Sequence, residues 1–183
     1  RLSVASLRTA NPQHCVPDFN QPAKTFVCRS LYHPLVPDCV PNNLTLDRRG
    51  LLLTGSNMSG KSTFVRAVNL NALAAQTLNT AFAEAYEAPP FALMTSIRIT
   101  DDLAEGSSYF MEEVTSIGRL LEAAKKDGIS RLFTIDEVFK GTNTIERIAA
   151  AKAILEYLAL AGNDLVLVST HDLELPELLR ETY

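Results

Sequence analysis

The stretch that decides the fold is Leu51-Leu52-Leu53-Thr54-Gly55-Ser56-Asn57-Met58-Ser59-Gly60-Lys61-Ser62. Its first four residues form a compact apolar run, which is typical of a buried strand. The remainder fits the pattern GxxxxGK[ST] at every fixed position. From Lys61 to about Asn79 we expect a helix, because Val65, Val68, Leu73 and Thr77 recur near helical spacing. A strand, a glycine-rich loop and a helix in this order are what a phosphate-binding loop requires.

The residue types in this loop have a chemical reason. Glycines let the backbone curl so that successive N–H groups point at phosphate oxygens, and the following helix directs its positive N-terminus at the same anion. Lys61 is expected to bridge the β- and γ-phosphates of ATP, and the Ser62 hydroxyl to ligate Mg²⁺. The expected ATP-binding residues are Gly55, Ser56, Asn57, Met58, Ser59, Gly60, Lys61, Ser62 and Thr63.

A second apolar run, residues 132–135, ends in the acids Asp136 and Glu137. Parallel sheets place ligands at the carboxyl ends of their strands, so these acids are expected beside the glycine-rich loop. Asp136 is then expected to hold Mg²⁺, usually through water, and Glu137 to orient or deprotonate the attacking water. The adjacent glutamate favours ATP hydrolysis over phosphoryl transfer to a metabolite.

From Gly50 onward, strands alternate with helices. Further strands are expected at 91–99 and 165–168, and further helices at 108–126, 145–160 and 173–181. On the helix at 108–126, Phe110, Val114, Ile117, Leu121 and Ala124 share one face. This alternation predicts an α/β fold with a mainly parallel sheet flanked by helices. Residues 11–49 are rich in proline, which excludes long helices, and contain one expected strand at 26–31.

Composition limits the range of functions. A chain of 183 residues fits a single domain. Its net charge is −4, and it has no Lys/Arg run longer than Arg48-Arg49 or Lys125-Lys126, so any main DNA-contact surface is expected outside these residues. No apolar run approaches the roughly 18 residues that span a bilayer, so no membrane contact is expected in this segment. The three cysteines form no CxxC pair, which favours reduced thiols and a cytoplasmic location.

The stretch from Leu53 to Thr63 resembles the ATPase domain, domain V, of the MutS mismatch-repair family, which usually has TGPNMGGKST there. Ser56 replaces the proline of that pattern and Ser59 replaces a glycine. Further blocks agree in order and spacing, so the resemblance covers nearly the whole chain. They are His33-Pro34-Leu35 with Val40-Pro41-Asn42, residues 101–113, Asp136-Glu137 with Gly141-Thr142-Asn143-Thr144, and Ser169-Thr170-His171.

The resemblance implies a P-loop NTPase of the ABC/SMC type that uses ATP and Mg²⁺. It divides the chain into the end of a lever helix at 1–10, a nucleotide-contacting subregion at 11–49 and a P-loop core at 50–183. It makes Lys61, Glu137 and His171 the catalytic residues, with His171 on the γ-phosphate or the attacking water. Ser107 and Ser108 would reach the ATP of a second subunit, and Asn143 and Thr144 would lie across the dimer interface.

Two departures from the family pattern indicate a divergent member. Cys39 stands where an aromatic residue usually stacks on adenine, so base contact would fall to the backbone of Val40 or to another ring. Phe139-Lys140 replaces a more usual Gly-Arg pair after the two acids.

The leading interpretation is the ATPase domain of a MutS-like DNA-repair or recombination protein, associated with the nucleoid. ATP would drive dimerisation with a second copy or a paralogue, coupled to mismatched or branched DNA bound by domains outside this chain. An ABC transporter ATPase would need an LSGGQ-like signature, which Gly106-Ser107-Ser108 lacks. A dimerisation module that binds ATP without hydrolysis or a DNA role is the alternative from another class.

Overall fold

The computed structural model describes residues 3–46, 49–56, 59–97, 109–126, 128–139, 143–160 and 162–183. In chain order its elements are α1 (Val4–Ala10), β1 (Phe26–Leu31), β2 (Asn42–Leu46), β3 (Gly50–Thr54), α2 (Lys61–Leu78), β4 (Ala85–Glu87), β5 (Ala92–Ser96), α3 (Tyr109–Ala124), β6 (Arg131–Asp136), α4 (Thr144–Leu160), β7 (Leu165–Thr170) and α5 (Glu174–Leu178). The predicted elements after Gly50 are present and begin and end near the expected residues. The expected strand at 91–99 is shorter, and its last two positions lie outside the described residues.

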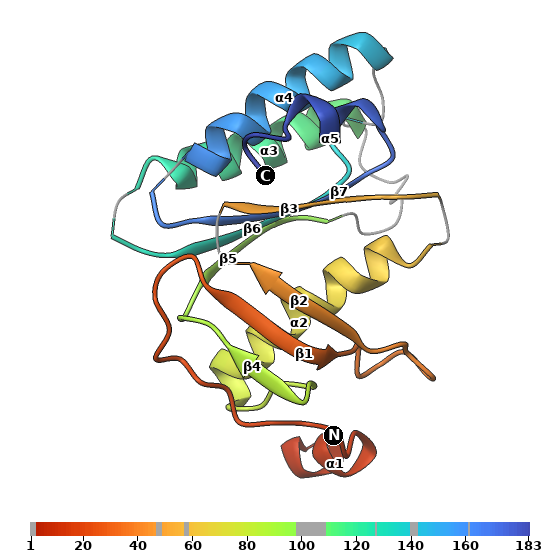
Figure 1. Ribbon diagram of the computed structural model, residues 1–183, viewed down its shortest axis with the longest axis vertical. Helices are drawn as coiled ribbons and strands as arrows, with labels where there is room; N and C mark the ends of the chain where they lie inside the picture. The colour runs from red at the N-terminus through yellow and green to blue at the C-terminus, as the bar shows by residue number, and fades with distance from the viewer. Residues whose placement is uncertain are drawn as a thin grey trace.

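A parallel sheet forms the centre of the molecule. Its strands follow the order β3-β7-β6-β5, and each neighbouring pair is parallel. Helices α3, α4 and α5 lie over one face of this sheet and α2 lies on the other (Figure 1). Every residue of β6 and β7 is buried, as expected for central strands covered on both faces. The predicted α/β fold with a parallel sheet flanked by helices is confirmed.

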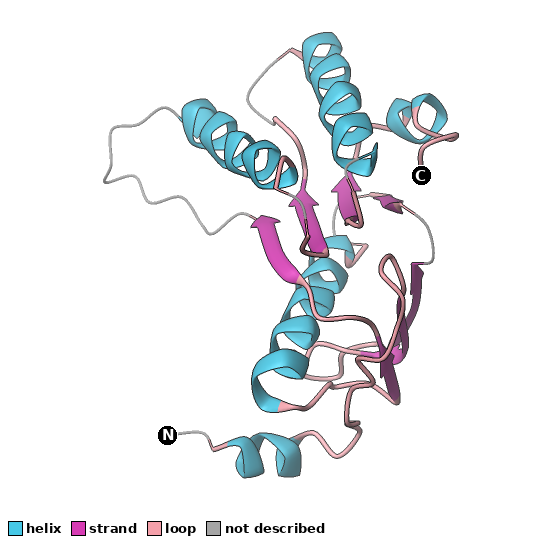
Figure 2. Ribbon diagram, turned by 90° about the vertical axis from the view of Figure 1, so that its left-hand side faces the viewer, coloured by secondary structure: helices cyan, strands magenta, loops and turns pink. Residues whose placement is uncertain are grey.

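A second, antiparallel sheet was not anticipated beyond its first strand. It has the order β2-β1-β4, and it lies with α2 on the same side of the parallel sheet (Figures 1 and 2). Its strands β2 and β4 are hard to predict because β4 has three residues and β2 begins with two asparagines, which are depleted in strands. This sheet brings the segment before Asn42 to one wall of the cavity described below.

Helix α2 packs against residues of both sheets. Val65, Val68, Ala72 and Ala75 belong to one buried cluster with Phe26 of β1 and Leu132 of β6. The helix predicted from the spacing of Val65, Val68, Leu73 and Thr77 is present, but Leu73 is 49% exposed and Thr77 is also exposed. Alanines such as Ala72 and Ala75 are buried on this helix instead.

The face predicted for α3 is only partly buried. Ile117 and Ala124 lie in the core, whereas Phe110 and Val114 are exposed. The ring of Phe110 lies 5.8 Å from the ring of Phe139, in the segment after β6. The first turn of α3 therefore contacts the segment that follows the two acids rather than the sheet.

A buried polar contact fixes α2 on β6. The side chains of Asn69 and Thr134 hydrogen bond with each other, with Nδ2 to Oγ1 at 3.0 Å, and Asn69 also donates to the Val65 carbonyl. Thr134 is fully buried, so its hydroxyl needs such a partner. The threonine that interrupts an otherwise apolar strand thus holds the helix of the glycine-rich loop on the strand that ends in Asp136.

Three further findings complete the fold. The cysteines Cys15, Cys28 and Cys39 are free thiols, as predicted. Within the described ranges, no helix combines the length and the apolar character needed to cross a bilayer. Helix α1 occupies most of the segment expected to be helical at the start of the chain.

Candidate functional site

The glycine-rich loop joins β3 to α2. Gly55 and Gly60 have φ angles of 149° and 91°, which side-chain-bearing residues rarely adopt, so glycine is required at both positions. Gly60 is also the N-cap of α2, and its carbonyl accepts from the Phe64 N–H at 2.9 Å. The loop positions Asn57 and Met58 lie outside the described residues. The Ser59 N–H donates to the Ser56 carbonyl at 3.3 Å, directly before the helix.

Lys61 turns back over the loop that precedes it. Its Nζ donates to the carbonyl oxygens of Gly55 at 2.5 Å and of Ser56 at 2.8 Å. The ammonium group is therefore held against the first two residues of the loop, and Lys61 itself is the first residue of α2. Both features place positive charge at one point, which is a suitable environment for a phosphate group.

Asp136 meets the loop from the end of β6. Its Oδ1 accepts a hydrogen bond from Ser62 Oγ at 3.1 Å and a second, short one from Ser169 Oγ. Because β6 and β7 are parallel neighbours with Asp136 opposite Ser169, the sheet register produces this contact. Sequence reasoning placed Ser169 in a motif but assigned no role to its hydroxyl.

The hydroxyl of Ser62 and the carboxylate of Asp136 are hard oxygen donors, which suit Mg²⁺. Elsewhere in the described part of the chain, and here, no group of three or more His, Cys, Asp and Glu side chains comes together. A cation between these two residues would keep water or phosphate oxygens as its other ligands, which is how Mg²⁺ usually binds at phosphate sites. The residues present therefore fit a magnesium ion bound together with a nucleotide.

Glu137 and His171 meet at the same edge of the sheet. His171 Nε2 contacts Glu137 Oε1, and the Glu137 N–H donates to the Ser169 carbonyl at 2.9 Å. Glu137 has a φ of 68°, a conformation that is strained for this residue type. The Glu137 side chain is 10% exposed, whereas that of His171 is 41% exposed. A cavity of about 240 Å³ lies beside the pair.

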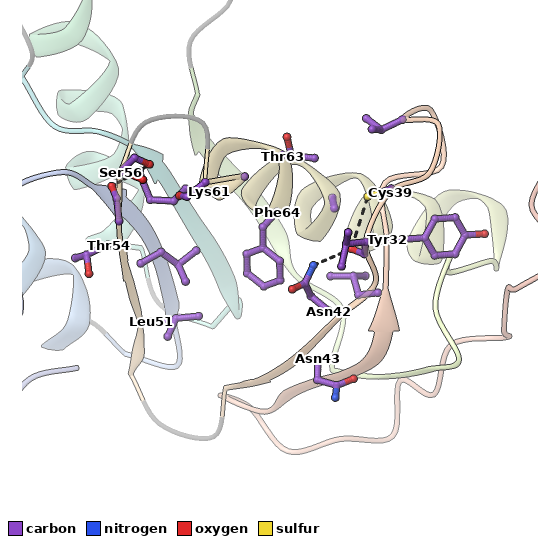
Figure 3. A pocket seen from close by; sticks show the side chains of 18 of the residues that line it. Tyr32, Cys39, Asn42, Asn43, Leu51, Thr54, Ser56, Lys61, Thr63 and Phe64 are labelled. Carbon is purple, nitrogen blue, oxygen red and sulfur yellow. Dashed lines mark hydrogen bonds between the residues drawn. The ribbon is translucent and has the colours of Figure 1, made fainter.

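A larger cavity of about 870 Å³ extends from the loop towards the antiparallel sheet. The loop residues Gly55, Ser56 and Lys61 line one end, and Cys39 and Asn42 line the other (Figure 3). The ring of Phe64 lies between these two ends, and it was not singled out from the sequence. Val40, which was predicted to contact the base, also lines the cavity and is 74% exposed. The cavity thus has a phosphate-binding end and an opposite end with mixed polar and apolar walls.

The turn before β2 is held by His33. The Leu35 N–H donates to His33 Nδ1 at 3.3 Å, and the His33 N–H donates to Cys39 Sγ at 3.3 Å. Burial lowers the pKa of His33, and the positive charge of Arg66 adds to the effect. A neutral ring that accepts at Nδ1 agrees with this direction. His33 therefore helps to shape the cavity wall rather than contributing a charge to it.

Of the four residues expected at a dimer interface, the structure describes Asn143 and Thr144. Asn143 and Thr144 are exposed at the start of α4, and Asn143 Oδ1 accepts from the Ile145 N–H at 2.9 Å. Neither side chain lines the large cavity. Ser107 and Ser108 lie outside the described residues, as do Lys140, Gly141 and Thr142.

The family model MutS domain V matches residues 51–183, a range that contains the glycine-rich loop, Asp136, Glu137 and His171 but not His33, Cys39, Val40 or Asn42. The chain belongs to the MutS family. Three bacterial proteins named DNA mismatch repair protein MutS are among its relatives. The MutS of an Exiguobacterium species is 40% identical over 152 residues, which cover 78% of this chain and 18% of the relative.

The MutS proteins of Pseudothermotoga lettingae and Staphylococcus haemolyticus are each 36% identical, and the matches cover 90% of this chain. They cover 21% and 19% of these relatives, so the chain spans about a fifth of the length of the MutS proteins that it matches. A 90% match also reaches residues before Leu51, where the family model begins. The predicted membership of the MutS family is confirmed. That the chain is a divergent member stays a prediction, which rests on Cys39 and Phe139.

Proposed function

We propose that this MutS domain V is a P-loop NTPase domain that binds and hydrolyses ATP with Mg²⁺. The observation that carries the proposal is the contact between Ser62 and Asp136, at 3.1 Å. It joins a loop built to bind phosphate to the acidic end of a neighbouring strand. Two such segments, far apart in the sequence, form the minimal set for holding a nucleotide and its metal ion.

The loop and Lys61 bind the phosphates in this proposal. Backbone N–H groups between Gly55 and Ser62 and the N-terminus of α2 face the anion, and Lys61 exchanges its carbonyl partners for phosphate oxygens. Ser62 and Asp136 hold Mg²⁺, which neutralises phosphate charge when it is bound. Ser169 orients the Asp136 carboxylate by donating to the same oxygen.

Glu137 acts on the attacking water. Glu137 directly follows Asp136 in the chain, and its carboxylate contacts His171. Glu137 orients the water and accepts its proton, and His171 either shares that proton or contacts the γ-phosphate. The strained backbone at Glu137 supports this role, because such conformations cluster at functional sites.

The base of the nucleotide occupies the far end of the large cavity. Val40 and Asn42 offer polar backbone and amide groups there, and Phe64 and Tyr32 are aromatic residues of the cavity wall. Cys39 provides no stacking surface. We therefore expect this domain to bind the base less tightly than a site with an aromatic ring at residue 39.

In the longer protein, ATP binding drives two such domains together, either copies or paralogues, with Ser107, Ser108, Asn143 and Thr144 at the contact. Hydrolysis releases them and shifts the conformations of DNA-binding domains elsewhere in that protein. The net charge of −4 agrees with mismatched or branched DNA being held by other domains in a cytoplasmic, nucleoid-associated protein. The isolated domain is expected to hydrolyse ATP slowly, since part of its site comes from the second subunit.

Steady-state ATP hydrolysis by the wild type and by Glu137→Gln tests the proposal. The variant should bind ATP with unchanged affinity and lose turnover by roughly 100-fold or more, which is the usual contribution of a general base. Glu181→Gln, which changes an exposed glutamate near the end of the chain, is the matched control and should keep full turnover. Full turnover in Glu137→Gln would contradict the assigned role. ATP binding without any turnover by the wild type would favour the dimerisation module instead.

A further inference from the structure

A pair of charged residues, Arg147 and Asp172, lies beside Glu137 and His171. Arg147 Nε donates to Asp172 Oδ2 at 3.0 Å, and an Arg147 Nη donates to Asp172 Oδ1 at 2.6 Å. The two side chains are 21% and 11% exposed. A bidentate arginine–carboxylate contact fixes both partners in one plane, which a single hydrogen bond does not.

The pair connects two segments that belong to different parts of the site. Arg147 lies in the first turn of α4, and its N–H donates to the Asn143 carbonyl at 2.9 Å. Asp172 directly follows His171 in the turn after β7. Arg147, Asp172, Glu137 and His171 all line the same cavity of about 240 Å³.

The His171 ring is held by its own contacts and by the backbone on either side of it. Its side chain is 41% exposed, so packing alone does not hold the ring against Glu137. The backbone on both sides of His171 is fixed instead. Thr170 ends β7, and its Oγ1 accepts from the Asp172 N–H at 3.1 Å, while the Asp172 carboxylate is held by Arg147.

We propose that Arg147 is a positioning residue that acts through Asp172 to hold His171 against Glu137. The inference rests on the proposed function and extends it to residues outside the glycine-rich loop and the two acids. Arg147 does not contact the nucleotide in this account. It links the first turn of α4, next to Asn143 and Thr144, to the placement of the His171 ring.

Hydrolysis kinetics test the proposal in two backgrounds. In the wild-type chain, Arg147→Met should lower kcat roughly tenfold, because misplacing one group in a catalytic pair costs at least this much, and should leave KM for ATP within about twofold. In the His171→Ala background the same substitution should lower kcat no further. A similar loss in both backgrounds would overturn the proposal, since Arg147 would then act independently of His171.

Two further variants separate positioning from folding. Asp172→Asn keeps the shape of the side chain and should also lower kcat. It replaces Arg147→Met in the test if that variant folds poorly. Lys152→Met breaks an exposed ion pair with Glu156 on the same helix, and should leave kcat unchanged. Retained kcat in both Arg147→Met and Asp172→Asn would overturn the proposal.

Nuclear magnetic resonance of the histidine rings gives a readout that does not need hydrolysis. The chain has three histidines, so His171→Ala assigns the signals of His171. Arg147→Met should broaden or average the His171 ring signals and leave those of His14 and His33 in place. Unchanged His171 signals would contradict the positioning role. Absence of ATP hydrolysis by the wild type would instead contradict the proposed function, and the ring signals would still decide the position of His171.

Discussion

Ser62 Oγ lies 3.1 Å from Asp136 Oδ1, although 74 positions separate the two residues in the chain. The contact arises because β3, β7 and β6 are parallel neighbours whose carboxyl ends lie at the same edge. Ser169, at the end of β7, donates to the same carboxylate oxygen. The segments that carry Ser62 and Ser169 thus meet at the carboxylate of Asp136, and this arrangement underlies the proposed nucleotide site.

Replacing Ser62 with alanine should lower Mg²⁺-dependent ATP turnover more than it lowers the stability of the fold. We expect Ser62→Ala to lower Mg²⁺-dependent ATP turnover by roughly 10- to 100-fold, since even outer-shell supports of a metal ligand cost this much. Ser62→Thr keeps the hydroxyl and should retain most of the turnover. Titrating Mg²⁺ at fixed ATP concentration measures the effect, and identical curves for Ser62→Ala and the wild type would contradict the role.

Removing the hydroxyl of Thr134 should destabilise the fold. Thr134→Val leaves the buried amide of Asn69 without its cross-element partner, which costs about 1–3 kcal/mol of the free energy of unfolding. Thr134→Ser keeps the hydroxyl and should lose less. Urea denaturation measures both free energies. A Thr134→Val chain as stable as the wild type would show that the hydrogen bond does not secure α2 to β6.

Two glycines should respond in opposite directions to alanine. A Cβ at Gly50 would lie 2.2 Å from the Val166 carbonyl oxygen and 2.7 Å from the ring of Tyr183, so Gly50→Ala should destabilise the fold by about 1–3 kcal/mol. A Cβ at Gly118, within α3, meets nothing within 4 Å. Gly118→Ala should therefore stabilise the fold by about 0.5–1 kcal/mol. Thermal denaturation compares the two, and a stable Gly50→Ala variant would contradict the packing of β3 against β7 and Tyr183.

Protonation of His33 should weaken the fold at acidic pH. Burial lowers the pKa of His33 in the folded state below the ordinary value of about 6.5, so the unfolded chain binds the proton more readily. The contribution of His33 to the free energy of unfolding is then fully present above about pH 6.5 and declines as pH falls towards the folded-state pKa. Comparing the wild type with His33→Gln from pH 5 to 8 isolates this contribution. A difference that stays constant with pH would contradict the shift.

Sequence patterns were sufficient where the candidate site consists of neighbouring residues in the chain. The glycine-rich loop and the Asp136-Glu137 pair are contiguous, and strand polarity alone predicts that they meet at one edge of a sheet. The packing of α2 was only partly predictable, because its buried face depends on a second sheet whose strand β4 has three residues. The contact between Arg147 and Asp172 was not predictable, since charged residues 25 positions apart have no shared period and meet only in the folded chain.

Binding of a fluorescent ATP analogue in the presence of Mg²⁺ tests the central claim most directly. The wild type should give saturable binding with one site per chain. Lys61→Ala should weaken it by roughly 10- to 100-fold, because a charge-assisted hydrogen bond contributes about 1.5–3 kcal/mol. Lys126→Ala, which removes an exposed lysine after α3, should bind like the wild type. Equal affinity of the wild type and Lys61→Ala, or no binding by either, would contradict the account.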